Sequence, residues 1–103
     1  MIRVILETPY AGGVEKNVEY ARRCMLDCLQ RGESPFASHL LYTQCLNDSV
    51  KHERSLGIKA GFEWRQSAEY TVVYTDLGMS EGMKKGIYHA ESLNHAIKYR
   101  QIL

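Results

Sequence analysis

Residues 70–76, with the sequence YTVVYTD, are the clearest strand in the chain and decide the fold. Their centre is rich in β-branched residues and lacks the apolar and polar alternation of a half-exposed strand. Strands that are buried on both faces lie in the interior of parallel sheets. We therefore predict that residues 70–76 form a central strand.

A second apolar run, IRVILE at residues 2–7, precedes a cluster of turn residues, TPYAGG at 8–13. That order is typical of a strand followed by a tight turn into a helix. From Val14 to Arg31 the apolar residues recur at steps of three and four, which indicates an amphipathic helix. Gly32 follows in the usual C-terminal position. This part of the sequence therefore predicts strand, turn and helix.

Residues 34–38, SPFAS, are short and contain Pro35, so they fit an edge strand. A polar and aromatic loop is predicted at 39–44. The residues NDS at 47–49 are suitable N-caps for a second helix that runs to about Gln66.

That second helix contains two glycines four residues apart, Gly57 and Gly61, which leave it with a bare face. Glycine in a helix costs about 1 kcal/mol relative to alanine, so a compensating close approach is expected. The face packs on the sheet, on another subunit or on a ligand. Trp64, late in the same helix, is expected in the core or an interface, or stacked on a base.

After the central strand, a third helix is predicted to begin near Ser80 and to end at Asn94, followed by a last strand within 95–102. Strands that alternate with helices form a parallel sheet covered on both faces. We predict one α/β domain over residues 1–103. It is a small Rossmann-like, flavodoxin-like fold of three layers, with a four-stranded parallel sheet in the order 2-1-3-4 and about three helices.

Composition narrows the possible partners. The 103 residues carry 13 Lys and Arg against 12 Asp and Glu, a formal net charge of +1, so the basic surface of a duplex-binding protein is missing. No apolar run approaches the roughly 18 residues of a membrane helix. Residues 1–7 match a strand and not a signal peptide, so we expect a cytoplasmic location.

Three cysteines, Cys24, Cys28 and Cys45, lack the spacing of a zinc site. We expect all three to be reduced small hydrophobes, and we expect neither a metal site nor a cofactor.

Ligands of open parallel sheets bind at the carboxyl ends of the strands, where crossovers diverge to opposite faces. Here that point lies between the first and third strands. Its glycines and its helix N-terminus suit a phosphate group, although such glycines also serve as turns and Asp76 also suits a helix cap. No GxGxxG or Walker A motif is present. The predicted binding residues of these loops are Thr8, Pro9, Tyr10, Ala11, Gly12, His39, Tyr42, Asp76, Gly78, Ser80, Gly82 and Met83.

Two motifs resemble those of a known family over nearly the whole chain. Residues 4–10 resemble a first-strand pattern, IYLAGPY, and the segment after residue 76 resembles GxxxExGxAxxxGKPV, with matches at Asp76, Ser80, Gly82 and Ala90 and with residues 94–97 in the GKPV place. The sequence is thus similar to the nucleoside 2-deoxyribosyltransferase-like superfamily, and more specifically to its short, uncharacterised phage and bacterial members. The resemblance implies the fold, a nucleotide ligand and a homo-oligomer of at least two subunits.

The same resemblance implies that catalysis is lost. The family's nucleophilic Glu corresponds to Gly86 and its assisting Tyr to Ile5, and a glycine cannot form the covalent intermediate. We predict no catalytic residue and expect Gly86 to enlarge the binding pocket and to remove a charge that repels phosphate. The leading interpretation is a non-catalytic protein that sequesters a nucleotide or an ADP-ribose-derived signal, as a phage inhibitor of host immune signalling would.

Two alternatives stay open. One is an active N-glycosidase or deoxyribosyltransferase with a relocated carboxylate, from Glu81, Glu91 or Glu7, oriented by a tyrosine at position 10 or 42. The other is a homo-oligomeric interaction protein without a small ligand, built on Gly57, Gly61 and Trp64. Five cations are candidate phosphate partners, of which only the two lysines follow a predicted binding loop: Arg54, Arg65, Arg100, Lys84 and Lys85.

Overall fold

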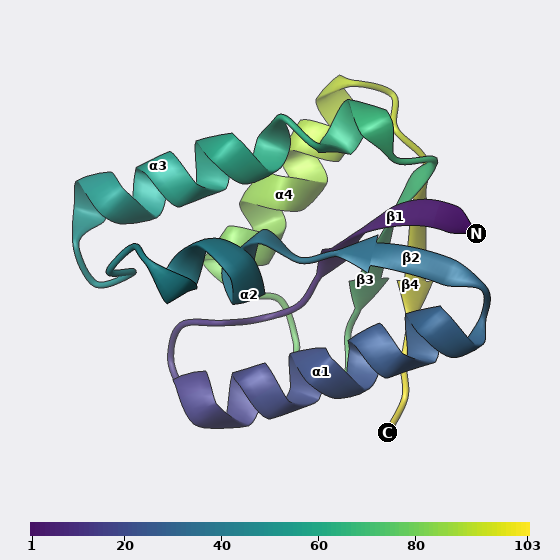
Figure 1. Ribbon diagram of the computed structural model, residues 1–103, viewed down its shortest axis with the longest axis horizontal. Coiled ribbons are helices and arrows are strands. Elements are labelled where there is room, and N and C mark those ends of the chain that lie inside the picture. The colour runs from purple at the N-terminus through teal and green to yellow at the C-terminus, as the bar shows by residue number, and fades with distance from the viewer.

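Four parallel strands form the sheet in a computed structural model that describes residues 1–103 (Figure 1). The order is β2-β1-β3-β4, as the sequence predicts, and β3 is one of the two central strands. Ile5 pairs with Phe36 on one side and with Thr71 on the other, so β1 is bonded along both edges. The strands are β1 (Ile2–Glu7), β2 (Glu33–Phe36), β3 (Tyr70–Tyr74) and β4 (Ile97–Arg100).

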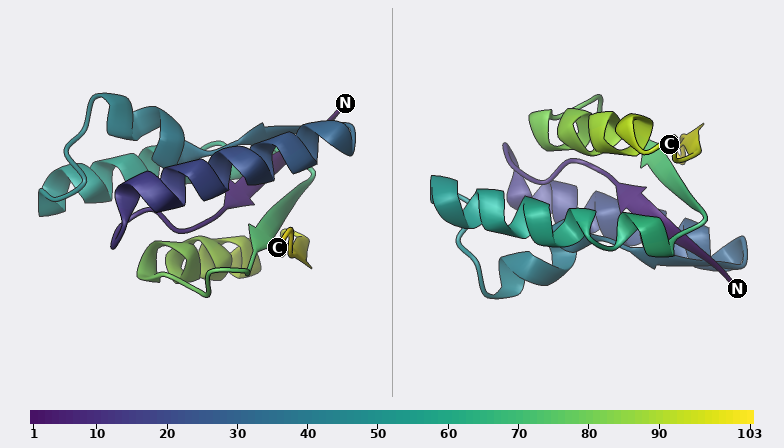
Figure 2. Two further views of the ribbon diagram at one scale, coloured as in Figure 1. Left: turned by 90° about the horizontal axis from the view of Figure 1, so that it is seen from below. Right: turned by 90° about the horizontal axis from the view of Figure 1, so that it is seen from above.

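Helices cover both faces of this sheet, which gives the predicted three layers. Figure 2 shows α1 on one side of the sheet and α4 on the other. The helices are α1 (Val14–Gln30), α2 (Ser38–Leu41), α3 (Lys51–Phe62) and α4 (Glu81–Ser92), with short 3₁₀ turns η1 (Tyr42–Gln44) and η2 (Arg65–Ser67). None of these helices is long and apolar enough to cross a membrane.

The two faces of the sheet have different chemistry because side chains alternate along each strand. On the α1 face, Val4, Leu6, Val72 and Tyr74 pack against buried residues of α1, among them the free cysteines 24 and 28. The opposite face carries a carboxyl group and a hydroxyl between its apolar residues, and it lies under α4 and η2. The residues of that face are Ile5, Glu7, Thr71 and Val73.

The segment between β2 and β3 corrects the sequence prediction of about three helices. Residues 39–44, expected as a loop, form η1 and, with Ser38 from the end of the expected strand, α2, so the chain has four α-helices. α3 begins at Lys51 after an extended Val50, and no side chain caps it. The Asn47 side chain instead accepts hydrogen bonds from the amide and hydroxyl of Ser49, at 3.0 and 2.6 Å, and stabilises the preceding turn.

The bare glycine face of α3 packs within the chain, against the α2 segment. A Cβ at Gly61 would lie 2.7 Å from the Cβ of Ser38, and one at Gly57 would lie 3.3 Å from Leu46 Cδ1. Within the chain, the two glycines therefore serve the close packing of α3 on the segment that precedes it. Trp64 is half exposed, packs against Phe36 and donates a 2.9 Å hydrogen bond to the hydroxyl of Tyr42.

α4 begins and ends where the sequence predicts. The Ser80 hydroxyl accepts a hydrogen bond from the amide of Met83, which caps the helix, and Asn94 adopts a φ of 53° just beyond its end. β4 lies within the predicted 95–102, and beyond its end the amide of Ile102 donates to the Asp76 carboxylate.

Candidate functional site

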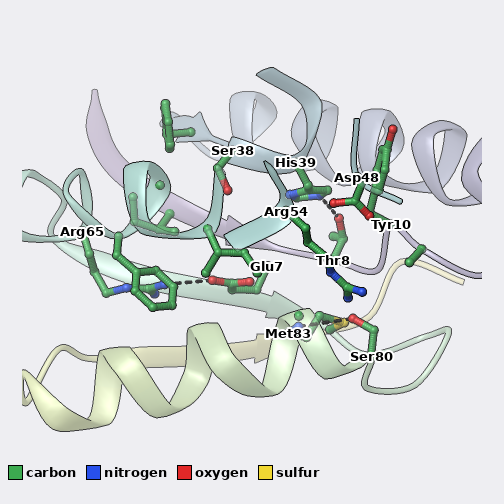
Figure 3. Close-up of a pocket in the computed structure, with 17 residues that line it drawn as sticks. Glu7, Thr8, Tyr10, Ser38, His39, Asp48, Arg54, Arg65, Ser80 and Met83 are labelled. Carbon is green, nitrogen blue, oxygen red and sulfur yellow. Dashed lines mark hydrogen bonds and ion pairs between the residues drawn. The ribbon is translucent and has the colours of Figure 1, made fainter. Parts of the chain in front are cut away.

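A pocket opens at the carboxyl end of β1, between α2, α3 and the N-terminus of α4 (Figure 3). Glu7 ends β1, Thr8 follows it directly, and Ser80 precedes α4. The cavity itself has a volume of about 90 Å³, and the space between the lining side chains is about 690 Å³ when the solvent at its open mouth is included. This position is the switch point at which open parallel sheets bind ligands.

The pocket brings together residues from all three predicted loops, namely Thr8, Tyr10, Ala11, His39, Ser80, Gly82 and Met83. The other predicted residues do not line it: Pro9, Gly12, Tyr42, Asp76, Gly78 and Gly86. Gly12 and Gly78 have φ values of 86° and 84°, so they serve as turn residues. Tyr42 lines an adjoining hollow instead.

Asp76 connects the end of β3 to the C-terminal residues. Its carboxylate accepts hydrogen bonds from the Tyr20 hydroxyl at 2.5 Å and from the amides of Ile102 and Leu103, and it does not face the ligand space. The role of Asp76 in the structure is therefore to hold the C-terminal segment against α1.

Glu7 is the main addition to the predicted site. Its side chain is 14% exposed and lines the pocket, and Oε2 accepts a 2.9 Å hydrogen bond from the buried guanidinium of Arg65. Oε1 has no partner within the protein, yet no polar side-chain atom is both buried and unpartnered. Oε1 is therefore accessible from the pocket.

The predicted enlargement at Gly86 is wrong, because the Glu7 carboxyl group already occupies that space. A Cβ at Gly86 would collide with Oε2 and would lie 2.7 Å from Oε1. The predicted loss of negative charge is corrected for the same reason. A glycine at this position of α4 makes room for a carboxyl group that comes from β1.

The environment of Glu7 also changes its acidity. Burial raises the pKa of Glu7 from 4.5 to about 7, and the Arg65 charge and hydrogen bond oppose this rise. Protonated and ionised forms are therefore both populated near neutral pH. A carboxyl group with such a pKa can donate to a ligand, accept from it or transfer a proton.

Thr8 and His39 form a second polar pair in the pocket. Thr8 Oγ1 and His39 Nε2 are 2.6 Å apart, and the hydroxyl is carried by a buried residue. Burial lowers the pKa of His39 to about 4, so the imidazole is neutral at pH 7. His39 therefore supplies hydrogen-bonding groups but no positive charge.

Arg54 of α3 supplies that charge. It is half-buried, its guanidinium makes no hydrogen bond or ion pair within the chain, and in Figure 3 it points between Thr8 and Met83. The other candidate cations are placed elsewhere: Arg100 binds Glu33, and Lys84 and Lys85 are exposed outside the pocket.

The rest of the wall combines apolar side chains with one further carboxylate, that of Asp48. The apolar part comes from Ile5, Phe36, Ile58 and Phe62. No group of three or more His, Cys, Asp or Glu residues has the geometry to hold a metal ion. The wall of the pocket therefore combines charged, hydrogen-bonding and apolar side chains.

Comparison with known proteins identifies the family. The profile of a family described as a domain of unknown function, DUF7768, matches residues 2–100. The chain belongs to the DUF7768 family. No match was found among curated proteins or among solved structures. The DUF7768 match spans all four strands, so the whole pocket lies within the family domain.

Ten residues that line the DUF7768 pocket are outside the predicted binding set, and they include the charged residues Glu7, Asp48, Arg54 and Arg65. Glu7 carries a sequence signal, since a charged residue at the end of a buried strand shares the face of Ile5. Arg54 is one of the five candidate cations and follows no predicted binding loop, and Asp48 resembles a helix cap, so neither is assigned to the pocket by its local pattern. Their place in the wall depends on how α3 packs.

Proposed function

We propose that this protein binds a small nucleotide, a nucleoside phosphate, in the pocket at the carboxyl end of β1. The observation that carries the proposal is the unpartnered guanidinium of Arg54, which faces the start of α4 across the pocket. A cation and a helix N-terminus together attract a phosphate group.

The remaining charges support a ligand with few phosphates. Arg65 is paired with Glu7, so Arg54 and Asp48 are the only other charged residues in the wall. Carboxylates at Glu7 and Asp48 accept hydrogen bonds from sugar hydroxyls, and Phe36 and Phe62 offer apolar surface to a base. A nucleoside monophosphate matches this set better than a polyphosphate.

Sequestration of an ADP-ribose-derived signal is the finer form of this proposal. It rests on the resemblance to phage members of the deoxyribosyltransferase-like superfamily. Mass spectrometry of small molecules that copurify with the protein tests it directly, since a sequestering protein retains its ligand through purification.

Substitution of Arg54 by glutamine is expected to weaken nucleotide binding about 10- to 100-fold, because a charge-assisted contact contributes about 1.5–3 kcal/mol. Isothermal titration calorimetry with nucleoside monophosphates, ADP-ribose and cyclic ADP-ribose isomers measures the change. Arg23→Gln, on the exposed face of α1, is the matched control. Equal affinities of the two variants, or no binding by the wild type, would contradict the proposal.

A second candidate function is cleavage of an N-glycosidic bond, and the position of Glu7 favours it. Of the three relocated carboxylates considered above, only Glu7 lines the pocket, since Glu81 and Glu91 are exposed outside it. In this reaction ionised Glu7 attacks the anomeric carbon, the bond to the base breaks, and the departing base takes a proton from solvent water. Water then hydrolyses the sugar ester.

For this reaction, Glu7→Gln is expected to abolish base release while the fold is retained, because an amide cannot form the ester intermediate. Chromatography of nucleosides and nucleoside monophosphates after incubation measures the free base. Glu81→Gln is the control, and its side chain is 77% exposed. If the wild type releases no base but binds nucleotides, the protein is a binding protein only.

A further inference from the structure

Arg65 has a hydrogen-bond partner for each of its guanidinium nitrogens, although it is 1% exposed. Nη2 donates to Glu7 Oε2 at 2.9 Å, Nη1 to Thr71 Oγ1 at 2.7 Å, and Nε to His89 Nδ1 at 3.0 Å. These partners come from β1, β3 and α4. The guanidinium plane is therefore set by three elements at once.

The hydrogen bonds around Thr71 have fixed directions at both ends of the chain. Arginine only donates, so Thr71 Oγ1 accepts from Arg65, and the carbonyl of Ala68 only accepts, so His95 Nε2 donates to it at 2.9 Å. In the neutral imidazole Nδ1 is then the acceptor, and it takes the Thr71 hydrogen at 3.0 Å. This chain of bonds leaves Arg65 a single orientation.

The ion pair of Arg65 with Glu7 differs from the other buried ion pair of the protein, Arg100 with Glu33. Arg100 binds both oxygens of Glu33, at 2.7 and 2.6 Å, and leaves neither open. Arg65 binds only Oε2 of Glu7, and Oε1 stays without a partner on the pocket side. The one-sided contact holds the carboxyl group while keeping an oxygen for another molecule.

We propose that Arg65 is a positioning residue, which holds Oε2 of Glu7 so that Oε1 meets a sugar hydroxyl of the bound nucleotide. This inference rests on the proposed nucleotide function. The face of Phe62 stacks on His89 with a centroid distance of 4.0 Å, and the Arg65 guanidinium lies 5.7 Å from the same ring. This stack supports His89, the acceptor of the Arg65 Nε hydrogen.

Sugar discrimination tests the inference, because a purely structural role of Arg65 would not change it. The probes are the four ribonucleoside 5′-monophosphates and their 2′-deoxy and 3′-deoxy forms, titrated by calorimetry. The wild type is expected to prefer the ribose form about tenfold over at least one deoxy form. Arg65→Lys keeps the positive charge but loses the planar guanidinium with its several donors. This variant and Glu7→Gln are expected to reduce the ratio of ribose to deoxy affinity to about 1–2. An unchanged ratio in Arg65→Lys overturns the inference.

A measurement without ligand separates this inference from the proposed function. The ¹³C signal of the Glu7 carboxyl, assigned with Glu7→Gln, is titrated in wild type, in Thr71→Val and in Thr75→Val. Without the Thr71 hydroxyl, Arg65 can move away from Glu7, so the Glu7 pKa is expected to rise above its wild-type value in Thr71→Val. In the control Thr75→Val the Glu7 pKa is expected to stay unchanged, because the Thr75 hydroxyl donates to the Arg100 carbonyl and not to this network. The same pKa in Thr71→Val overturns the inference even if nucleotides bind.

Other ionisable groups near Glu7 have to be kept in view when these titrations are interpreted. His89 and His95 lie behind Arg65, and the pKa of His89 is lowered by burial and by the Arg65 charge. Across the pocket are His39, Asp48 and Arg54.

Failure of all nucleotides to bind the wild type would overturn the proposed function, and the carboxyl titration would still decide whether Arg65 holds Glu7.

Discussion

Replacement of Glu33 by leucine is expected to lower the free energy of unfolding by about 3–5 kcal/mol at pH 7, because it leaves a buried arginine without its anion. Glu33 is 3% exposed and Arg100 10% exposed at the side chain. Both oxygens of Glu33 accept from Arg100, and Oε2 also accepts from the Tyr70 hydroxyl. Urea denaturation followed by circular dichroism measures the loss.

The free energy of unfolding measured at decreasing pH is the control for this prediction. Hydrogen bonds from Arg100 are the largest cause that lowers the pKa of Glu33 to about 2, from 4.5. A carboxyl group with a lowered pKa stabilises the fold above its unfolded value and loses that contribution as the pH falls from about 4.5 to 2. The wild type and Glu81→Leu should show the full acid loss, and Glu33→Leu should show a smaller one. Asp27 and Asp76, whose pKa values are also lowered, still contribute to that smaller loss. Equal acid sensitivity of all three would contradict the assignment.

The substitution Gly86→Ala is expected to destabilise the protein by about 3 kcal/mol and to abolish sugar discrimination. The new methyl group would occupy the position of the Glu7 carboxyl, which then has to leave Arg65. A buried guanidinium without its anion is costly, and the displaced carboxyl no longer presents Oε1 to a ligand. Urea denaturation and the nucleotide titrations described above measure the two effects.

Gly82→Ala is the matched control for this change, since it lies in the same helix. A Cβ there would meet only Ser80 Oγ, at 3.9 Å, and alanine is the better helix former, so its stability should equal or exceed that of the wild type. If Gly86→Ala were as stable as Gly82→Ala, the close contact between α4 and Glu7 would not exist in solution.

The architecture follows from local patterns in the sequence. The YTVVYTD strand, the IRVILE run and the turn residues after each of them predict a parallel sheet in the order 2-1-3-4. The same patterns predict a binding site at the ends of β1 and β3, and the pocket lies at the end of β1 with the start of α4 in its wall. Periodicity and turn chemistry act over a few residues, so a single sequence carries them.

The sequence does not predict the short helix α2 or the residue at which α3 begins, because neither depends on a local pattern alone. Residues 38–44 have no clear period, and their helical turns pack on the glycines of α3, a contact between segments that neither segment shows alone. The polar residues at 47–49 resemble helix caps, yet Asn47 stabilises a turn before α3 instead. Local propensity ranks these options only weakly.

Fold class, strand order and the region of the site were therefore determined by the sequence by itself. Only the tertiary structure decided the chemistry of the site: that Glu7 fills the space at Gly86, that Arg65 turns inward to hold it, and that Arg54 reaches the pocket from α3. Each of these contacts joins elements far apart in the chain. Their partners depend on strand register and on how α3, η2 and α4 pack on the sheet, which no local pattern specifies.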